Sequence, residues 1–182
     1  MAQITAAEIV WRFTTTVGAA GDTTVNTTVG TFLGKYAATS AWAGGVLNDL
    51  FSDISGAENT AGQIDFASLA ILNNNTLNIA ENGVVYISAE TAGGASLAVG
   101  VDPTATSAKG SAAAQLLTIA SKTTAPAGVT FSSPTTVATG LALSNIPVAN
   151  VKGIWVRRTA ANTAAMSADG ATLAVSVDSG NL

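Results

Sequence analysis

The sequence predicts an all-β fold, an antiparallel sandwich or jelly-roll-like domain with one short helix and long loops. About ten short stretches have the composition and alternation of strands, and Gly, Asn and Pro separate them. Only one stretch has apolar residues at the helical spacing. A chain of 182 residues is long enough to bury a core of this kind.

The N-terminal region begins with an alternating stretch, residues 8–16. Ile9, Trp11 and Phe13 would lie on one face of a strand there, and Val10, Arg12 and Thr14 would lie on the other. The Gly-rich residues 18–22 predict a turn after this strand.

The next segments predict a hairpin partner and then a loop. Residues 23–29 are rich in Thr and Val and could pair back on the first strand, whereas residues 30–45 look like a long loop. We therefore expect residues 1–45 to form an N-terminal strand and arm region, packed on neighbours or exchanged with them. Residues 46–182 form the β-sandwich domain in this view, and a single domain overall is favoured.

One helix is expected at residues 46–54, as a small cap over one end of the sandwich. Gly56 would end it. Its apolar residues have the spacing i, i+3, i+4 and i+7, and they are Leu47, Leu50, Phe51 and Ile54.

The middle of the chain predicts a run of short strands. Residues 64–72 are apolar on both faces, so this strand should be central, and Asn82-Gly83 predicts a hairpin turn. Residues 102–114 should be a long surface loop. The other expected strands are residues 76–80, 84–89, 96–101, 116–121, 129–131 and 141–146.

The clearest strand signal lies at Asn150–Thr159, which combines Ile, Trp and Val with a basic end. Arg157 and Arg158 are neighbours in this strand, so they should point to opposite faces and cannot form a single clamp. Residues 171–177 predict a closing strand. We expect these last two strands to pair as an antiparallel hairpin with a long connection.

The large aromatic and basic residues divide into two expected groups. Aromatic residues in strands and in the helix should anchor the core; these are Trp11, Phe13, Phe51, Phe66 and Trp155. Aromatic residues in the loop and Arg residues of the expected strands are candidates for an interface, because both types are enriched there; these are Tyr36, Trp42, Arg12, Arg157 and Arg158.

The composition restricts the chemistry. The chain has no Cys and no His, which excludes disulfides and a nucleophile activated by His. A net charge of -4 disfavours nucleic acid as a partner. The chain also lacks an apolar run long enough for a membrane helix and a basic, apolar signal peptide, so we expect no membrane partner and no secretory export.

Carboxylates are the remaining candidates for a catalytic or metal site. Glu58 with Asp65, or Asp49 with Asp53, could form a glycosidase pair, but solvated carboxylates are far commoner. Three further residues lie near turns, where a turn-forming role is commoner than calcium binding; these are Asp102, Asp169 and Asp178. We expect no enzyme activity, no cofactor and no metal.

Two segments carry a resemblance to a known class of proteins. Residues 49–58, followed by Gly62 and Asn73-Asn74-Asn75, resemble a segment of tailed-bacteriophage virion structural proteins. Residues 144–159, followed by residues 169–173, resemble the end of the same proteins. The resemblance covers roughly half of the chain and is closest to capsid decoration, or cement, proteins.

This resemblance implies a structural protein on the outside of a phage capsid. It would stabilise contacts between major capsid subunits, form a homo-oligomer with a trimer favoured, and be made in the host cytoplasm. A tail, baseplate or neck protein is a second interpretation. A secreted carbohydrate-binding module or adhesin is a third, and it would need exposed aromatic rings, for which Trp42 and Tyr36 are the candidates.

Overall fold

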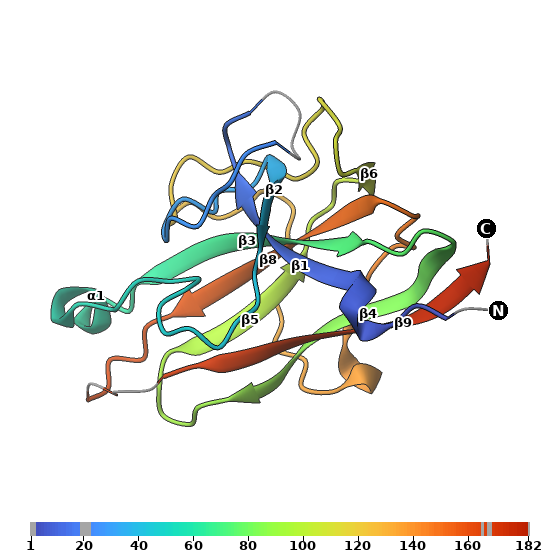
Figure 1. Ribbon diagram of the computed structural model, residues 1–182. Coiled ribbons are helices and arrows are strands. Elements are labelled where there is room, and N and C mark those ends of the chain that lie inside the picture. The colour runs from blue at the N-terminus through green and yellow to red at the C-terminus, as the bar shows by residue number, and fades with distance from the viewer. Residues whose placement is uncertain (1–2, 19–22, 165, 167–168, 182) are drawn as a thin grey trace.

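The computed structural model describes residues 3–18, 23–164, 166 and 169–181, and it confirms the all-β expectation (Figure 1). Two antiparallel sheets carry most of the regular structure. The strands are β1 (Ile9–Thr15), β2 (Tyr36–Ala41), β3 (Ile64–Asn73), β4 (Asn78–Glu90), β5 (Ser96–Val101), β6 (Ser107–Ala108), β7 (Leu141–Ala142), β8 (Asn150–Thr159) and β9 (Ala171–Asn181). The helical elements are η1 (Ala6–Glu8), α1 (Gly56–Thr60) and η2 (Val137–Thr139).

The first sheet has the order β2-β1-β3-β8-β5, and β6 also pairs with β8. Its central strand is β3, as the apolar residues on both faces predict, and nine of its ten residues are buried. Leu69 lies opposite Ile154, and Asp65 lies opposite Arg158. Because β1 lies between β2 and β3, part of the expected arm region forms the interior of this sheet.

The second sheet has the order β7-β4-β9. The hairpin turn predicted at Asn82-Gly83 is wrong, because β4 continues through it and pairs with β9 on both sides. The pairing register shifts between Glu81 and Val84, and Asn82 has φ 50°. The Asn-Gly signal therefore marks a β-bulge, where the left-handed backbone takes up extra length in one strand.

The main core lies between the two sheets. Leu69, Ile71 and Ile154 of the first sheet and Val85 of the second are buried in one cluster. Phe13 stacks on Phe32 with ring centroids 4.4 Å apart. The apolar face of β9, formed by Leu173, Val175 and Val177, packs against this cluster from the second sheet.

Long loops cover the other face of the first sheet. Trp155 is fully buried there, in a cluster with Phe66 and Ile119. Leu117 and Phe131, from the loops that follow β6, pack against this cluster. The expected strands at 116–121 and 129–131 are wrong, since only isolated bridges at Thr118 and Ser132 occur in these loops.

The helix predicted at 46–54 is also wrong. Asn48 has φ 59°, a left-handed conformation that interrupts a right-handed helix, and this segment consists of turns and bends. Leu50 is nevertheless buried, so the apolar pattern correctly predicts that this residue packs in the core. The helix that does form, α1, begins at Gly56, the residue that was expected to end one.

The loops around β2 differ from the predictions as well. Residues 23–29 form no strand, and β2 lies inside the expected loop at 30–45. Hydrogen bonds from Asn26 to Ser40 and from Thr39 to Thr24 hold the segment 23–29 beside β2. Most of the turn predicted at 18–22 lies outside the described residues.

The last two long strands do not form the predicted hairpin. β8 pairs with β3, β5 and β6 in the first sheet, whereas β9 pairs with β4 in the second. Both strands carry an apolar face, and the two faces meet across the core rather than within one sheet. Two shorter differences also occur: β6 interrupts the expected loop at 102–114, and the strand expected at 141–146 is reduced to β7.

Candidate functional site

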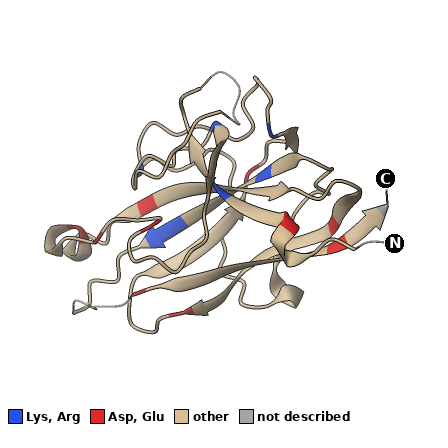
Figure 2. Ribbon diagram, in the orientation of Figure 1, with Lys and Arg blue, Asp and Glu red and all other residues tan. Residues whose placement is uncertain are grey.

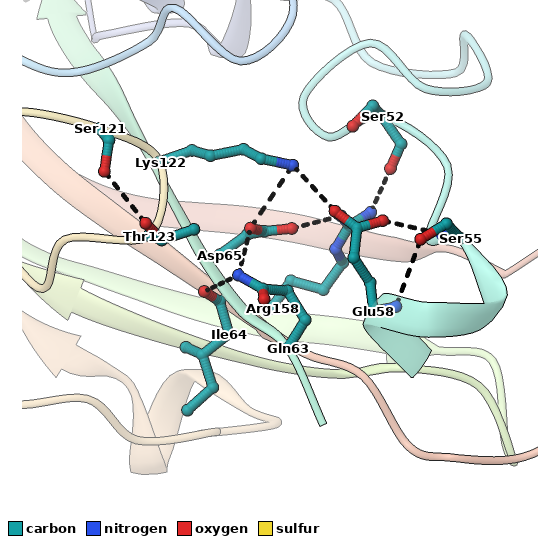
Figure 3. A network of polar contacts seen from close by, with 10 residues as sticks. All are labelled: Ser52, Ser55, Glu58, Gln63, Ile64, Asp65, Ser121, Lys122, Thr123 and Arg158. Atoms are coloured by element: carbon teal, nitrogen blue, oxygen red, sulfur yellow. Dashed lines mark hydrogen bonds and ion pairs between the residues drawn. The ribbon is translucent and has the colours of Figure 1, made fainter. Parts of the chain in front are cut away.

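Four charged side chains gather at one end of the first sheet (Figure 3). β3 and β8 supply Asp65 and Arg158, which are direct partners in the strand register. Glu58 comes from α1, and Lys122 comes from the loop that covers the sheet. We call these four residues the charged cluster.

The charged cluster is held by close contacts. Arg158 donates from Nη2 to Asp65 Oδ2 at 2.6 Å and from Nη1 to the carbonyl oxygen of Ser52 at 2.6 Å. Lys122 Nζ lies 3.6 Å from Asp65 Oδ1 and 3.5 Å from Glu58 Oε1. Since the Asp65 side chain is almost completely buried, its charge depends on these cations for compensation.

The helix α1 positions Glu58 through a capping box. Ser55 Oγ accepts a hydrogen bond from the backbone N–H of Glu58 at 3.2 Å, and Glu58 Oε2 accepts one from the backbone N–H of Ser55 at 2.8 Å. The second bond is the main cause of the lowered pKa of Glu58. The sequence pattern Ser-x-x-Glu at 55–58 is a local signal of this helix start, and no helix was expected at these residues.

A shallow hollow lies beside the charged cluster, and Asp65, Lys122 and Arg158 help to line it. Phe32, Phe51 and Phe66 line its apolar side. The guanidinium carbon of Arg158 lies 4.8 Å from the centre of the Phe51 ring, so a cation–π contact joins the polar and apolar sides.

The cluster does bring together Glu58 and Asp65, one of the two carboxylate pairs considered from the sequence, since both contact Lys122. A glycosidase acid needs a raised pKa, whereas the pKa of Glu58 is lowered. Two cations facing two carboxylates also balance in charge. The arrangement is therefore suited to holding α1 and the covering loop against β3 and β8.

A second polar group, centred on Asp102, is buried under the covering loops. Asp102 Oδ2 accepts hydrogen bonds from Trp155 Nε1 at 2.7 Å and from the backbone N–H of Leu117 at 2.9 Å. Lys152 Nζ donates to the carbonyl oxygens of Asp102 and Thr104 at 2.7 and 2.6 Å. Burial lowers the pKa of Lys152, and the charge of Asp102 partly opposes this shift.

The sequence identified only part of the role of Asp102. Its Oδ1 accepts from the backbone N–H of Thr104 at 2.8 Å, which is the turn-forming bond expected of an Asp near a turn. The link to Trp155, 53 residues further along the chain, has no local sequence signal. Asp169 and Asp178 also accept hydrogen bonds, from Ala95 and Asn82.

The expected core anchors differ in how deeply they are buried. Phe13, Phe66 and Trp155 are buried. Trp11 and Phe51 are partly buried and pack against the main core.

The expected interface residues are more enclosed than the sequence suggested. Tyr36 is buried and its hydroxyl donates to the carbonyl oxygen of Ala112 at 3.1 Å, so it does not present an exposed ring. Trp42 is partly buried, edge-on to Trp11, and its Nε1 donates to Asp49 at 2.6 Å. Asp49, from the other carboxylate pair considered, thus serves to hold this indole.

The three Arg candidates are also partly buried. Arg12 donates from Nη1 to the carbonyl oxygen of Ala38 at 3.2 Å. The guanidinium carbon of Arg157 lies 5.3 Å from the ring centre of Phe131 on one face of the sheet. Arg158 contacts Asp65 on the other face. The two neighbours therefore act on different faces of the sheet.

Large aliphatic side chains are exposed on a loop beside the charged cluster. Val46 and Leu47 are adjacent and are 69% and 67% exposed. The loop is anchored before them by Trp42 and after them by the buried Leu50. We call Val46 and Leu47 the exposed aliphatic pair, and their side chains are available for an apolar contact with another protein.

Within the described ranges, no group of three or more Asp and Glu residues could hold a metal ion. The helices described there are all too short to cross a membrane. No protein-family model, curated protein or solved structure matches this chain.

Proposed function

We propose that this chain is a structural protein of a tailed-phage particle, one that binds the outside of the capsid shell and stabilises contacts between major capsid subunits. The observation that carries the proposal is the exposed aliphatic pair, Val46 and Leu47, which offers an apolar contact to another protein. The resemblance of residues 49–58 and 144–159 to phage virion proteins supplies the kind of partner.

The sparse charge of the molecule supports the same role. Lys, Arg, Asp and Glu together make up 10% of the chain, and outside the charged cluster they are spread over the sheets and the loops (Figure 2). A surface of this kind can be covered by a partner without removing many charges from water. Bound only to the assembled shell, such a protein would stabilise that state by mass action, and many symmetric copies would add their effects.

The first test is co-sedimentation of the purified protein with undecorated phage heads. We expect saturable binding at a fixed copy ratio, with the protein on the capsid surface. Replacing the exposed aliphatic pair by Ser should weaken binding by about ten-fold or more, because losing apolar contact worth about 1.4 kcal/mol changes affinity ten-fold.

A matched control uses aliphatic side chains exposed elsewhere. Leu77, just before β4, is 61% exposed, and Val137, the first residue of η2, is 50% exposed. Their replacement by Ser should leave head binding unchanged. Equal binding by the Val46→Ser/Leu47→Ser variant would overturn the assignment of the surface, and binding to tails or necks instead of heads would favour the second interpretation.

A further inference from the structure

One sheet edge differs from the others in the part of the chain that the structure describes. β9 lies at the end of the second sheet and pairs with β4 on one side. It has 11 residues, and no described segment forms backbone hydrogen bonds with its outer edge. Figure 1 shows β9 as a long red strand that ends beside the N-terminal segment, where Ile4 bonds to the Ser179 side chain.

The other sheet edges are covered or very short. The backbone N–H of Thr39 in β2 donates to Thr24, so the preceding loop covers that edge. Val99 in β5 exchanges two backbone hydrogen bonds with Ser132, at 2.8 and 3.0 Å. β7, the opposite end of the second sheet, has only two residues.

The sequence of β9 lacks two of the features that usually protect a free edge, and the register shifts of its pairing with β4 add their extra residues to β4 rather than to β9. Natural edges are blunted by Lys, Pro, bulges or a covering segment. β9 contains no Lys and no Pro, and its one charged residue is Asp178. Leu173, Val175 and Val177 form its apolar face and are only partly buried, so a further strand would complete their burial.

We propose that two copies of this chain pair through β9, antiparallel and across a two-fold axis at Val175. Val175 then lies opposite its own copy, and Leu173 lies opposite Val177. All three apolar residues of the inward face meet apolar partners, and each face of the sheet continues into the second copy.

The distribution of charge along β9 supports a second copy of this chain as the partner at its outer edge. In this register Asp178 lies opposite Thr172, whose hydroxyl can donate to a carboxylate. Ala174 lies opposite Ser176, so the outward face opposes small side chains and no like charges. The contact is self-complementary, as a two-fold interface requires.

This inference goes beyond the proposed function and does not depend on it, since it concerns the purified chain without phage heads. A two-fold contact produces dimers. The trimer implied by the resemblance would require a different surface.

The first experiment measures the mass of the purified protein by light scattering. We expect twice the mass of the 18.0 kDa chain. The Ala174→Lys/Ser176→Lys variant places like charges opposite one another and should have the mass of a single chain. Ala113→Lys/Ala114→Lys adds the same charge to exposed loop positions and should leave the dimer intact.

A monomeric wild-type protein, or an edge variant with unchanged mass, would overturn the proposal. A second experiment remains decisive if the Lys variant fails to fold. The chain has no Cys, so introduced thiols are the only ones present. A mixture of Ala174→Cys and Ser176→Cys proteins should form covalent dimers on mild oxidation, well above the yield of either protein alone, and equal yields would refute the register.

Discussion

At the scale of single residues, Trp155 links two kinds of interaction. Its ring is fully buried between the first sheet and the covering loops, and its Nε1 donates to the buried Asp102. We expect Trp155→Ala to lower the free energy of unfolding by about 3–5 kcal/mol through loss of packing. Trp155→Phe keeps most of the ring and should cost about 1–3 kcal/mol, since Asp102 loses one donor.

Urea unfolding of both variants, followed by circular dichroism, checks this prediction. An equal loss in the two variants would show that the hydrogen bond to Asp102 dominates and that ring packing contributes little. A Trp155→Ala protein as stable as the wild type would contradict the central position of this residue.

The buried Lys152 should make stability depend on pH. Burial lowers its pKa in the folded state below the ordinary value of 10.5. Between these two values the unfolded chain binds more protons, so this group raises the stability of the fold as pH rises toward 10.5. Its destabilising effect is complete below the folded-state pKa and disappears above 10.5.

The measurement compares the wild type with Lys152→Met by urea unfolding at several alkaline pH values. The variant loses the donors to Asp102 and Thr104 at every pH. The difference in free energy of unfolding, wild type minus variant, should therefore increase with pH. A constant or decreasing difference would contradict the lowered pKa.

At the scale of elements, the charged cluster joins β3, β8, α1 and a covering loop. We expect Asp65→Ala to cost about 3–5 kcal/mol, because Arg158 and Lys122 lose the carboxylate between them and Arg158 is largely buried. Asp53→Ala, at an exposed position of the neighbouring loop, should change stability by less than about 0.5 kcal/mol.

A double variant separates two contributions to the stability loss, the lost attraction between Asp65 and Arg158 and the cost of leaving Arg158 buried without a carboxylate partner. Asp65→Ala/Arg158→Met removes both partners of the closest pair, so it should be more stable than Asp65→Ala alone. Thermal or urea unfolding of the single and double variants gives this comparison. If the double variant were the less stable protein, the packing of Arg158 on Phe51 would outweigh its charge.

Strands could be predicted from the sequence where their local pattern agrees with their surroundings. β1 alternates, and β3 and β8 are apolar on both faces, as strands within a covered sheet must be. The helical spacing at 46–54 gave a wrong helix prediction, because Leu50 faces the core while Leu47, three residues earlier, is exposed. Periodicity alone does not report that Asn48 reverses the backbone between them.

The candidate sites were harder to predict because their residues are distant in sequence. The register of β3 and β8 brings together Asp65 and Arg158, which are 93 residues apart. No local pattern encodes this pairing. In contrast, the capping box of Ser55 and Glu58 is local and could have been recognised.

At the scale of the whole molecule, the arrangement of strands bears on whether residues 1–45 can be a separate arm. β1 pairs with both β2 and β3, and Phe13 stacks on Phe32 inside the main core. We expect a fragment of residues 46–182 to lose cooperative thermal unfolding. A fragment that unfolded as cooperatively as the full chain would show that the first 45 residues are dispensable for the fold.

The strand order also has a consequence for synthesis on the ribosome. β8 completes the pairing of β3, and β9 completes the pairing of β4, so both sheets need the last strands to be made. Until then β3 lacks β8 and β4 lacks β9. Pairing between strands that are far apart in the sequence forms slowly. The nascent chain must therefore remain incompletely folded, with one edge of β3 and one edge of β4 unpaired, until β8 and β9 have been made.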